Sequence, residues 1–503
     1  MQKPVSRRYA LKLAAGLSVT TALCHAGLPM AFARTDSEAW NKIGGLRLPL
    51  AMAPQDLPLL GRVPEGLAGT LYRNGPAVPE GYNRVPQHRF DGDGFVHAFE
   101  FNLNKVTHRG KFVRTRKFAD EQEFGDLFKP GFGSLWPESQ AISNLDEINA
   151  SNTNIVAHAN RLMTLWEAGS AWEIDPQTLD ALGPVKLQHD IEHLPFSAHP
   201  KLDSDGTLWN FGQIPWSGQM AIYHLDDRGK LGNFRLLDLQ HSGMIHDFAI
   251  TERHLILVLP PLVWTKDKVA VGRTFLDGYE WRANQPADVF VIDKNSLEIT
   301  RRHTLPPNFH FHTAAANDRD DGGIDLTLCQ YEDAGILWSL MDTWYSASTA
   351  RVEQTALPKL RTATLPATSG DGQIENLLTQ SIEFPRAVND HRKTRNQICW
   401  CVGVDEGTGL LQRIHAINLS SCELQSHDYG RDTYVDEHIF VPKPPAEAQS
   451  LDDGWLLGTH YNFTQNKSTL SVFNALHLSR GPIMTAALPH PMPPGLHGNF
   501  VPA

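Results

Sequence analysis

Histidine supplies the clearest candidates for chemistry in this chain. The sequence has 23 histidines but only 10 tyrosines, and a neutral imidazole is the commonest metal ligand among protein side chains. Most single histidines are structural, so the excess favours a metal site without identifying it. The candidates lie beside turns or at the start of short apolar runs, and they are His199, His246, His312 and His497.

Wide spacing separates these four histidines. The gaps are 47, 66 and 185 residues, which match neither the HExxH motif nor an EF-hand loop. Ligands so far apart in the sequence must be brought together by the fold. A radial fold, in which each ligand comes from a different unit and points to the axis, meets that requirement.

Cysteines show no competing metal or disulfide pattern. The four that follow Cys24 have no CxxC spacing and no disulfide framework. Cys399 and Cys401 alternate in an apolar run. Both are therefore predicted to be small core residues on one face of a strand.

Composition and charge exclude several classes of protein. The formal net charge is −11, so the basic footprint of a nucleic-acid-binding protein is missing. The chain is 41% hydrophobic and 20% charged, which disfavours both a disordered protein and a multi-span membrane protein. A serine hydrolase is disfavoured because the sequence has no GxSxG elbow.

The first 33 residues are predicted to be a cleaved export signal of the twin-arginine type. Arg7 and Arg8 precede a modestly apolar stretch, and the sequence AFA ending at Ala33 has the small-x-small pattern that signal peptidase reads. Glycine and polar residues interrupt the apolar stretch, which disfavours a permanent membrane span. We therefore expect cleavage near Ala33, a periplasmic or secreted protein, and a single domain over residues 34–503.

The remaining sequence is typical of an all-β protein. Short apolar or alternating runs recur between Gly, Pro, Asn and Asp residues. A chain this long divides into domains or uses a fold that grows by repetition, and blades around an axis leave few exposed sheet edges. The predicted strands include residues 161–166, 207–211, 221–225, 254–259, 288–292, 324–329, 397–404, 413–419, 455–460 and 469–473.

Two segments break this pattern. Residues 119–128 are polar and helix-like, and residues 345–380 are rich in Ser, Thr, Ala and Pro with little periodicity. Both are predicted to be insertions on one face, where substrate-covering elements usually lie, and a long exposed loop is the alternative for each. The run DGDG at 91–94 lacks EF-hand spacing and the lysine of a phosphate loop. It is predicted to be a tight turn between strands in which Asp91 and Asp93 cap neighbouring backbone amides.

Eight motifs, in order along the chain, resemble the carotenoid cleavage oxygenase family. The resemblance extends from about residue 45 to the C-terminus. It implies a seven-bladed β-propeller with Fe(II) on the axis beneath a cap of helices and loops. The motifs are GTLYRNGP at 69–76, FDGDGFVH at 90–97, LWEAG at 165–169, AHPK at 198–201, IHDF at 245–248, FH at 311–312, EFPR at 383–386 and DEHIFV at 436–441.

The resemblance also assigns the site residues by motif position. A histidine that binds a metal through one nitrogen carries its proton on the other, and a carboxylate that accepts this proton fixes the tautomer and raises the ligand's basicity. Imidazole suits Fe, Zn and Cu alike, so iron is implied by the resemblance rather than by the ligands. The expected ligands are His199, His246, His312 and His497, with Glu167, Glu383 and Glu437 behind them.

The third expected ligand lies in a degenerate motif. The family often continues with Asn and an aromatic residue, whereas His312 is followed by Thr313 and three alanines. These smaller residues predict a wider pocket. His310 would face the same side of an unbroken strand as His312, so it is the competing ligand.

The resemblance implies an O2-dependent dioxygenase that splits a carbon–carbon double bond into two carbonyl fragments, with no catalytic residue beyond the metal centre. The expected substrate is a carotenoid or apocarotenoid. The alternative is a phenolic alkene of the lignostilbene or isoeugenol type, which relatives bind with a tyrosine and a lysine. Lys111 and Lys117 are the candidates for that lysine. A propeller that only binds a ligand is the alternative of another class.

One apolar stretch raises the question of membrane contact. Residues 124–136 combine phenylalanines, leucines and a tryptophan with Lys129. Such a loop is suited to a bilayer interface and equally to the wall of a core. Peripheral membrane contact therefore stands as an expectation for this stretch.

Overall fold

The fold was analysed in a computed structural model of the 503-residue chain. It describes residues 42–187, 194–214, 217–239, 243–265, 273–345, 357–388 and 397–503. The described part is mostly β, as the sequence predicts. None of its helices is long and apolar enough to cross a bilayer. The predicted export signal and its cleavage near Ala33 lie outside the described residues.

Two sheets join the beginning of the described chain to its end. In one, the order β1-β5-β4-β3-β33 pairs the last strand with an early one; in the other, the order β2-β32-β31-β30-β28 does the same, with β29 also beside β30. These strands are β1 (Ala51–Asp56), β2 (Leu59–Gly61), β3 (Gly69–Ala77), β4 (Asp93–Asn102), β5 (Lys105–Phe112), β28 (Thr433–Val435), β29 (Ile439–Pro442), β30 (Gly454–Asn462), β31 (Lys467–Asn474), β32 (Met484–Ala487) and β33 (Gly498–Pro502).

Three further sheets follow one another along the chain. Their orders are β6-β7-β8-β9, β10-β11-β12-β13 and β14-β15-β18-β19-β23, and β16 and β17 form a separate pair. The strands are β6 (Asn154–His158), β7 (Arg161–Leu165), β8 (Trp172–Ile174), β9 (Ala181–Pro184), β10 (Lys201–Leu202), β11 (Leu208–Ile214), β12 (Gln219–Leu225), β13 (Leu231–Asp238), β14 (Ala249–Ile250), β15 (His254–Leu259), β16 (Leu262–Trp264), β17 (Tyr279–Trp281), β18 (Ala287–Asp293), β19 (Ile299–Leu305) and β23 (Gly370–Asp371).

A long sheet of order β20-β21-β22-β24-β25-β26-β27 completes the set. Its longest strand, β24, pairs with β22 through its first part and with β25 through its last part. The strands are β20 (Phe309–Asp318), β21 (Ile324–Tyr331), β22 (Lys359–Leu365), β24 (Gln373–Ala387), β25 (Ile398–Val404), β26 (Leu411–Asn418) and β27 (Leu424–Asp428).

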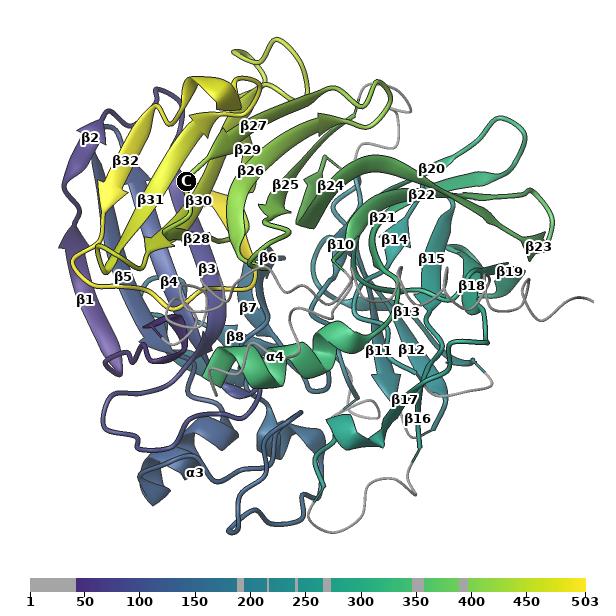
Figure 1. The fold of residues 1–503 in the computed structure, drawn as a ribbon, viewed down its shortest axis with the longest axis horizontal. Coiled ribbons are helices and arrows are strands. Elements are labelled where there is room, and N and C mark those ends of the chain that lie inside the picture. The colour runs from purple at the N-terminus through teal and green to yellow at the C-terminus, as the bar shows by residue number, and fades with distance from the viewer. Residues whose placement is uncertain are drawn as a thin grey trace, which may run out of the picture.

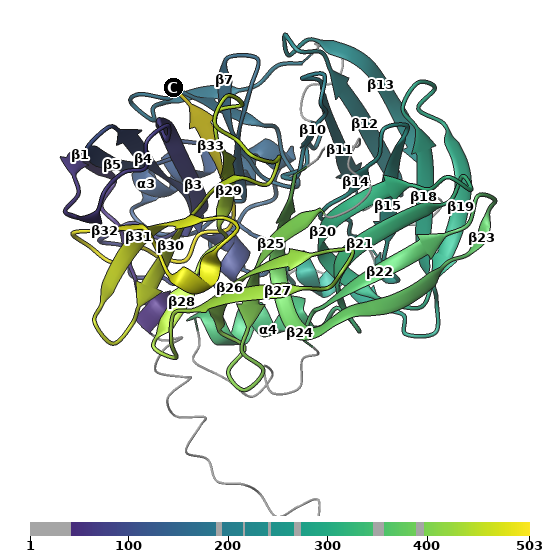
Figure 2. The same cartoon turned by 90° about the horizontal axis from the view of Figure 1, so that it is seen from above.

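The sheets stand side by side around the middle of the molecule (Figures 1 and 2). Buried side chains fill the space between neighbours. Phe211 and Ile222 of one sheet, for example, lie in the same apolar cluster as Leu257 and Phe290 of the next. All ten predicted strands coincide with observed strands to within a few residues, because alternating apolar runs mark one buried face of a strand.

The two α-helices of the described residues lie on one side of the sheets (Figure 1). Helix α3 (Arg116–Phe124) begins where the Thr115 hydroxyl accepts a hydrogen bond from the backbone of Phe118, and it ends at Gly125, which has a left-handed conformation. Residues 119–128 are therefore helical only in their first part. A second helix, α4 (Gly335–Tyr345), was not predicted.

The predicted insertion at 345–380 is wrong for its second half. Residues 359–365 form β22 and residues 373–387 form β24, both inside the long sheet. The short segment 346–356 lies outside the described residues. Strands β22 and β24 were not predicted because they are only partly buried and have polar residues on both faces, so their sequences show no clear alternation of apolar and polar residues.

Candidate metal centre

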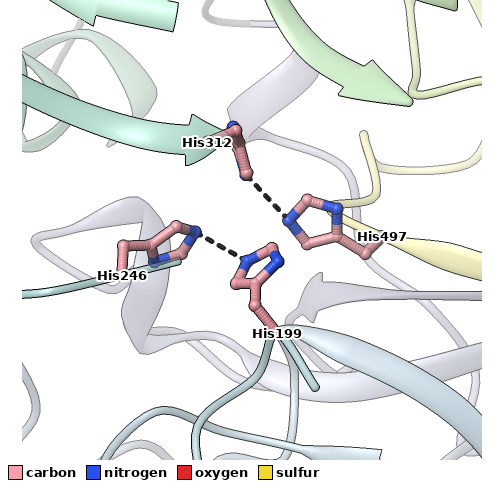
Figure 3. A group of neighbouring side chains, drawn as sticks. All are labelled: His199, His246, His312 and His497. Carbon is pink, nitrogen blue, oxygen red and sulfur yellow. Dashed lines mark hydrogen bonds between the residues drawn. The ribbon is translucent and has the colours of Figure 1, made fainter. Parts of the chain in front are cut away.

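Four histidines from four different sheets converge in the middle of the molecule. His199 lies two residues before β10, and His246 lies three residues before β14. His312 is within β20, and His497 immediately precedes β33. The structure therefore brings together the four expected ligands, at the strand ends and inner edges that face the centre (Figure 3).

The geometry of these four residues suits a single ion. The Nε2 atoms of His199 and His246 are 2.9 Å apart, and those of His312 and His497 are 3.2 Å apart. All four ligand atoms lie within 4.8 Å of one another, and all four side chains are buried. Four imidazole nitrogens that face one point cannot all donate hydrogen bonds to one another. A metal cation at that point would bind their lone pairs.

Three glutamates stand behind three of the histidines. The Nδ1 atom of His312 lies 2.5 Å from Oε2 of Glu383, and that of His497 lies 3.0 Å from Oε1 of Glu437. Nδ1 of His246 is also hydrogen bonded to Glu167. Each carboxylate accepts the Nδ1 proton, which leaves the Nε2 lone pair directed to the centre.

Local strand irregularities decide which residues reach the centre. The register between β20 and β21 shifts between His310 and Thr313, so residues 310 and 312 do not share a face as an unbroken strand would require. His312 joins the cluster, whereas the ring nitrogens of His310 are buried and have no hydrogen-bond partner among the residues that the structure describes. The competing assignment to His310 is therefore not supported by position.

Arginines that the sequence reasoning missed hold Glu437. Nε of Arg386 lies 2.7 Å from Oε1 of Glu437, and Nη1 of Arg73 lies 3.4 Å from Oε2. Burial raises the pKa of Glu437, but Arg386 and His497 outweigh it and hold this pKa below its ordinary value. Glu437 is therefore a carboxylate that remains ionised beside His497.

Asp247 was missed as well. Burial raises its pKa, but Lys201, with Nζ 2.7 Å from Oδ1, holds the pKa of Asp247 below its ordinary value. The nearest approach to His199 is 3.9 Å, from Oδ1 to Nδ1. The signal was present in the sequence: Arg386, Asp247 and Lys201 stand inside motifs that contain a site histidine or glutamate, and Arg73 stands in the motif GTLYRNGP.

The electrostatics of the site favour neutral imidazoles at two positions. Burial lowers the pKa of His199, and the neighbouring imidazoles lower it further. Burial likewise lowers the pKa of His497 to about 3. His246 differs: burial lowers its pKa, but Glu167 outweighs burial and raises it. Because only a deprotonated nitrogen can bind a metal, neutral histidines are ready ligands.

A cavity of about 570 Å³ opens onto this cluster, and His246, His312 and His497 line it. Its wall is largely aromatic and aliphatic. Part of the wall comes from the loop at 130–135 and from helix α4, through Ile336 and Leu340. Other wall residues include Phe90, Trp166, Tyr279, Phe311, Phe384 and Tyr434. An apolar cavity with few polar groups is typical of a site for an apolar small molecule.

Two expectations about charged residues are wrong. Lys111 pairs with Asp180, and Lys117 is buried between Asp93 and Glu121, so neither lines the cavity or reaches a phenol there. Asp93 therefore neutralises Lys117 instead of capping a turn.

The other aspartate of the DGDG run, Asp91, does not cap a local turn either. Residues 89–91 form a short 3-10 helix and β4 begins at Asp93, so the predicted tight turn between strands is wrong. The carboxylate of Asp91 accepts hydrogen bonds from the backbone of Phe132 and Gly133 and from the hydroxyl of Ser134. It thereby fixes the loop that forms one wall of the cavity.

The cysteines behave as predicted. Cys399 and Cys401 are free and buried on β25, in one apolar cluster with Cys329. They are core residues of the long sheet.

Known proteins share this arrangement of the chain. Residues 50–502 match the family model described as RPE65, retinal pigment epithelial membrane protein. Apocarotenoid-15,15'-oxygenase of Synechocystis is 28% identical over 458 residues, which cover 88% of this chain and 91% of that protein. Isoeugenol monooxygenase of Pseudomonas nitroreducens is 24% identical over 467 residues, which cover 89% of this chain and 94% of that protein.

Solved structures agree with the sequence comparison. Cobalt-substituted ACO of Synechocystis matches this chain with a TM-score of 0.82 at 28% identity, covering 93% of this chain and 99% of that one. The likeness therefore covers nearly the whole of this chain.

Proposed function

Because the chain belongs to the RPE65/carotenoid oxygenase family, we propose that it is a non-haem Fe(II) dioxygenase that cleaves a carbon–carbon double bond of a carotenoid or apocarotenoid. The observation that carries the proposal is the cluster of four buried histidines at the end of an apolar cavity. Cleavage adds one oxygen atom of O2 to each carbon of the double bond and yields two carbonyl products.

The four histidines would hold the iron through Nε2. When bound, Fe(II) would supply the activation of O2. Glu167, Glu383 and Glu437 orient the rings by accepting their Nδ1 protons. The chain's remaining contribution is a dry, shaped cavity that holds the alkene beside the centre and excludes bulk water. A proton-transferring residue is not required, because no proton is gained or lost in the overall cleavage.

A seven-bladed propeller is the finer architecture that we propose for the sheets. Its support is that β24 pairs with two different sets of strands, so the long sheet divides into two blades at this strand. With that division, the sheets that contain three or more strands supply seven blades. Helix α4 and the loop at 130–135 would form the cap, since both line the cavity.

The second candidate substrate is a phenolic alkene. The observation in its favour is the similarity to isoeugenol monooxygenase over most of both chains, together with the tyrosines of the cavity wall. Against it stands the position of Lys111 and Lys117, which are engaged elsewhere. We therefore place the carotenoid or apocarotenoid first.

Location is proposed from the sequence alone. The leader ending near Ala33 supports twin-arginine export to the periplasm or beyond.

Peripheral contact with a bilayer is proposed for the stretch at residues 124–136. Phe124, at its start, is 48% exposed beside Phe128, which supports this contact. Apolar polyenes dissolve in lipid, so such a contact would place the cavity near its substrate.

The activity test uses the full mature chain. We expect metal-free protein to be inactive, and Fe(II) under air to restore cleavage of an apocarotenal, with two carbonyl products identified by mass spectrometry. A hydroxystilbene assayed in parallel separates the two substrate classes. Labelled O2 should appear in both products.

Activity that persists after chelation would contradict the metal centre. Cleavage of the hydroxystilbene alone would replace the first substrate by the second. His312→Leu serves as the inactive control, because it removes one candidate ligand from the cluster.

A further inference from the structure

The carboxylate of Asp247 is a hub of hydrogen bonds beside the histidine cluster. Oδ1 lies 2.7 Å from Nζ of Lys201 and accepts a 2.8 Å hydrogen bond from the backbone of Phe248. Oδ2 accepts 2.8 Å hydrogen bonds from both the backbone and the hydroxyl of Thr313. Asp247 is only 2% exposed, and four donors occupy the acceptor sites of its two oxygens.

Each partner of Asp247 stands next to a different histidine of the cluster. Asp247 itself follows His246, Lys201 lies two residues after His199, and Thr313 follows His312. These segments belong to three sheets, begun by β10, β14 and β20. One carboxylate therefore connects three chain segments that share no backbone hydrogen-bond ladder.

This connection restrains the positions of the histidines relative to one another before a metal is bound. Four imidazoles that face one point gain little from one another, and an ordered arrangement costs conformational entropy. A buried charge held by several charge-assisted hydrogen bonds is a strong and directional restraint. The fourth histidine lies outside this network, because His497 is held by Glu437.

We infer that Asp247 is a positioning residue whose carboxylate clamps the segments of His199, His246 and His312 together, so that three of the four metal-binding rings are preorganised. The inference rests on the proposed metal centre. It assigns a role to Thr313, the residue at which this chain departs from the family pattern, because its hydroxyl is one of the donors. Asp247 does not line the cavity, so it acts through the histidines.

The test measures metal binding rather than turnover. Metal-free wild type and Asp247→Asn are titrated with Co²⁺ while the visible absorption of the bound ion is followed. Asparagine keeps the size of the side chain but loses the charge and one acceptor oxygen. We expect the affinity to fall about 10- to 100-fold, as for other residues that support metal ligands, and the rise in melting temperature on adding Co²⁺ to shrink.

The matched control is Asp453→Asn. Asp453 is also buried, its Oδ1 lies 2.9 Å from Nζ of Lys443, and it accepts a hydrogen bond from a backbone amide. It immediately precedes β30, and none of the four histidines lies in or next to a strand of the sheet that contains β30. We expect this variant to lose stability with and without metal alike and to keep the wild-type affinity for Co²⁺.

A milder pair of variants covers the case in which Asp247→Asn does not fold. Thr313→Val removes only the hydroxyl donor, and Thr313→Ser retains it. We expect weaker Co²⁺ binding for valine and recovery for serine. Wild-type affinity in Asp247→Asn, or in Thr313→Val if the former does not fold, would overturn the clamp. Failure of the wild type to bind Co²⁺ would instead overturn the metal centre itself.

Discussion

At the residue scale, the alternative between His310 and His312 shows how much one strand irregularity decides. Both are histidines of β20, and both are buried. The register shift after His310 turns only His312 toward the cluster. Burial lowers the pKa of His310 to about 4, so it is a neutral ring whose nitrogens have no hydrogen-bond partner among the described residues.

This difference predicts opposite effects for the same substitution at the two positions. His310→Leu should keep the affinity for Co²⁺ within about threefold and should cost little stability, because replacing an unsatisfied buried polar group by an apolar one of similar size is nearly neutral. His312→Leu should abolish tight binding. A titration that ranks the two variants the other way would make His310 the ligand.

At the element scale, strand β24 carries two site residues that a regular strand could not place together. Residues three apart point to opposite faces of an unbroken strand. The pairing with β25 shifts between Glu383 and Arg386, and Phe384 has a φ of 53°. This bulge directs Glu383 to His312 and Arg386 to Glu437, while the ring of Phe384 lies 5.1 Å from that of His312.

The left-handed backbone at Phe384 predicts an inverted order of stability. Glycine adopts positive φ without a steric penalty, whereas alanine pays about 1–2 kcal/mol there. Phe384→Gly should therefore be more stable than Phe384→Ala by about 1 kcal/mol in denaturant unfolding. At Val402, a buried position of regular strand β25, alanine should be the more stable of the two. The same order at both positions would contradict the bulge.

At the scale of the whole molecule, buried neutral histidines away from the cluster link stability to pH. Burial lowers the pKa of His97 well below its ordinary value, of His108 and His438 to about 3, and of His460 to about 4. The unfolded chain takes up these protons near pH 6.5, and the folded chain does so only below about pH 4. Stability therefore falls as the pH falls through this window. His246, whose pKa Glu167 raises against the effect of burial, contributes with the opposite sign.

The melting temperature of the metal-free protein should thus drop by several degrees between pH 7 and pH 5. His108→Gln removes one of these groups, and its melting temperature should depend less steeply on pH even though the variant is less stable at pH 7. Differential scanning fluorimetry at matched ionic strength measures both. A melting temperature that stays constant or rises on acidification would refute the linkage.

The sequence by itself determined the kind of fold and the positions of the candidate site. Alternating apolar runs predicted strands such as β15 and β18 because burial of one face leaves a period of two in the residue pattern. The family resemblance marked the four histidines and three glutamates by position, and the fold brings the four histidines together. Helix α4 and strands β22 and β24 were not predicted, because their apolar residues do not follow one clear helical or strand period.

Only the tertiary structure decided which of these residues act together. The faces of His310 and His312 depend on a register shift with a neighbouring strand, and Asp247 meets Lys201 and Thr313 only when three sheets adjoin. Lys117 lies in the sequence region expected for a phenol ligand, yet it is buried against Asp93 and Glu121. The physical reason is common to all: strand pairing and burial join segments far apart in the chain, and the pattern along a single strand does not contain that information.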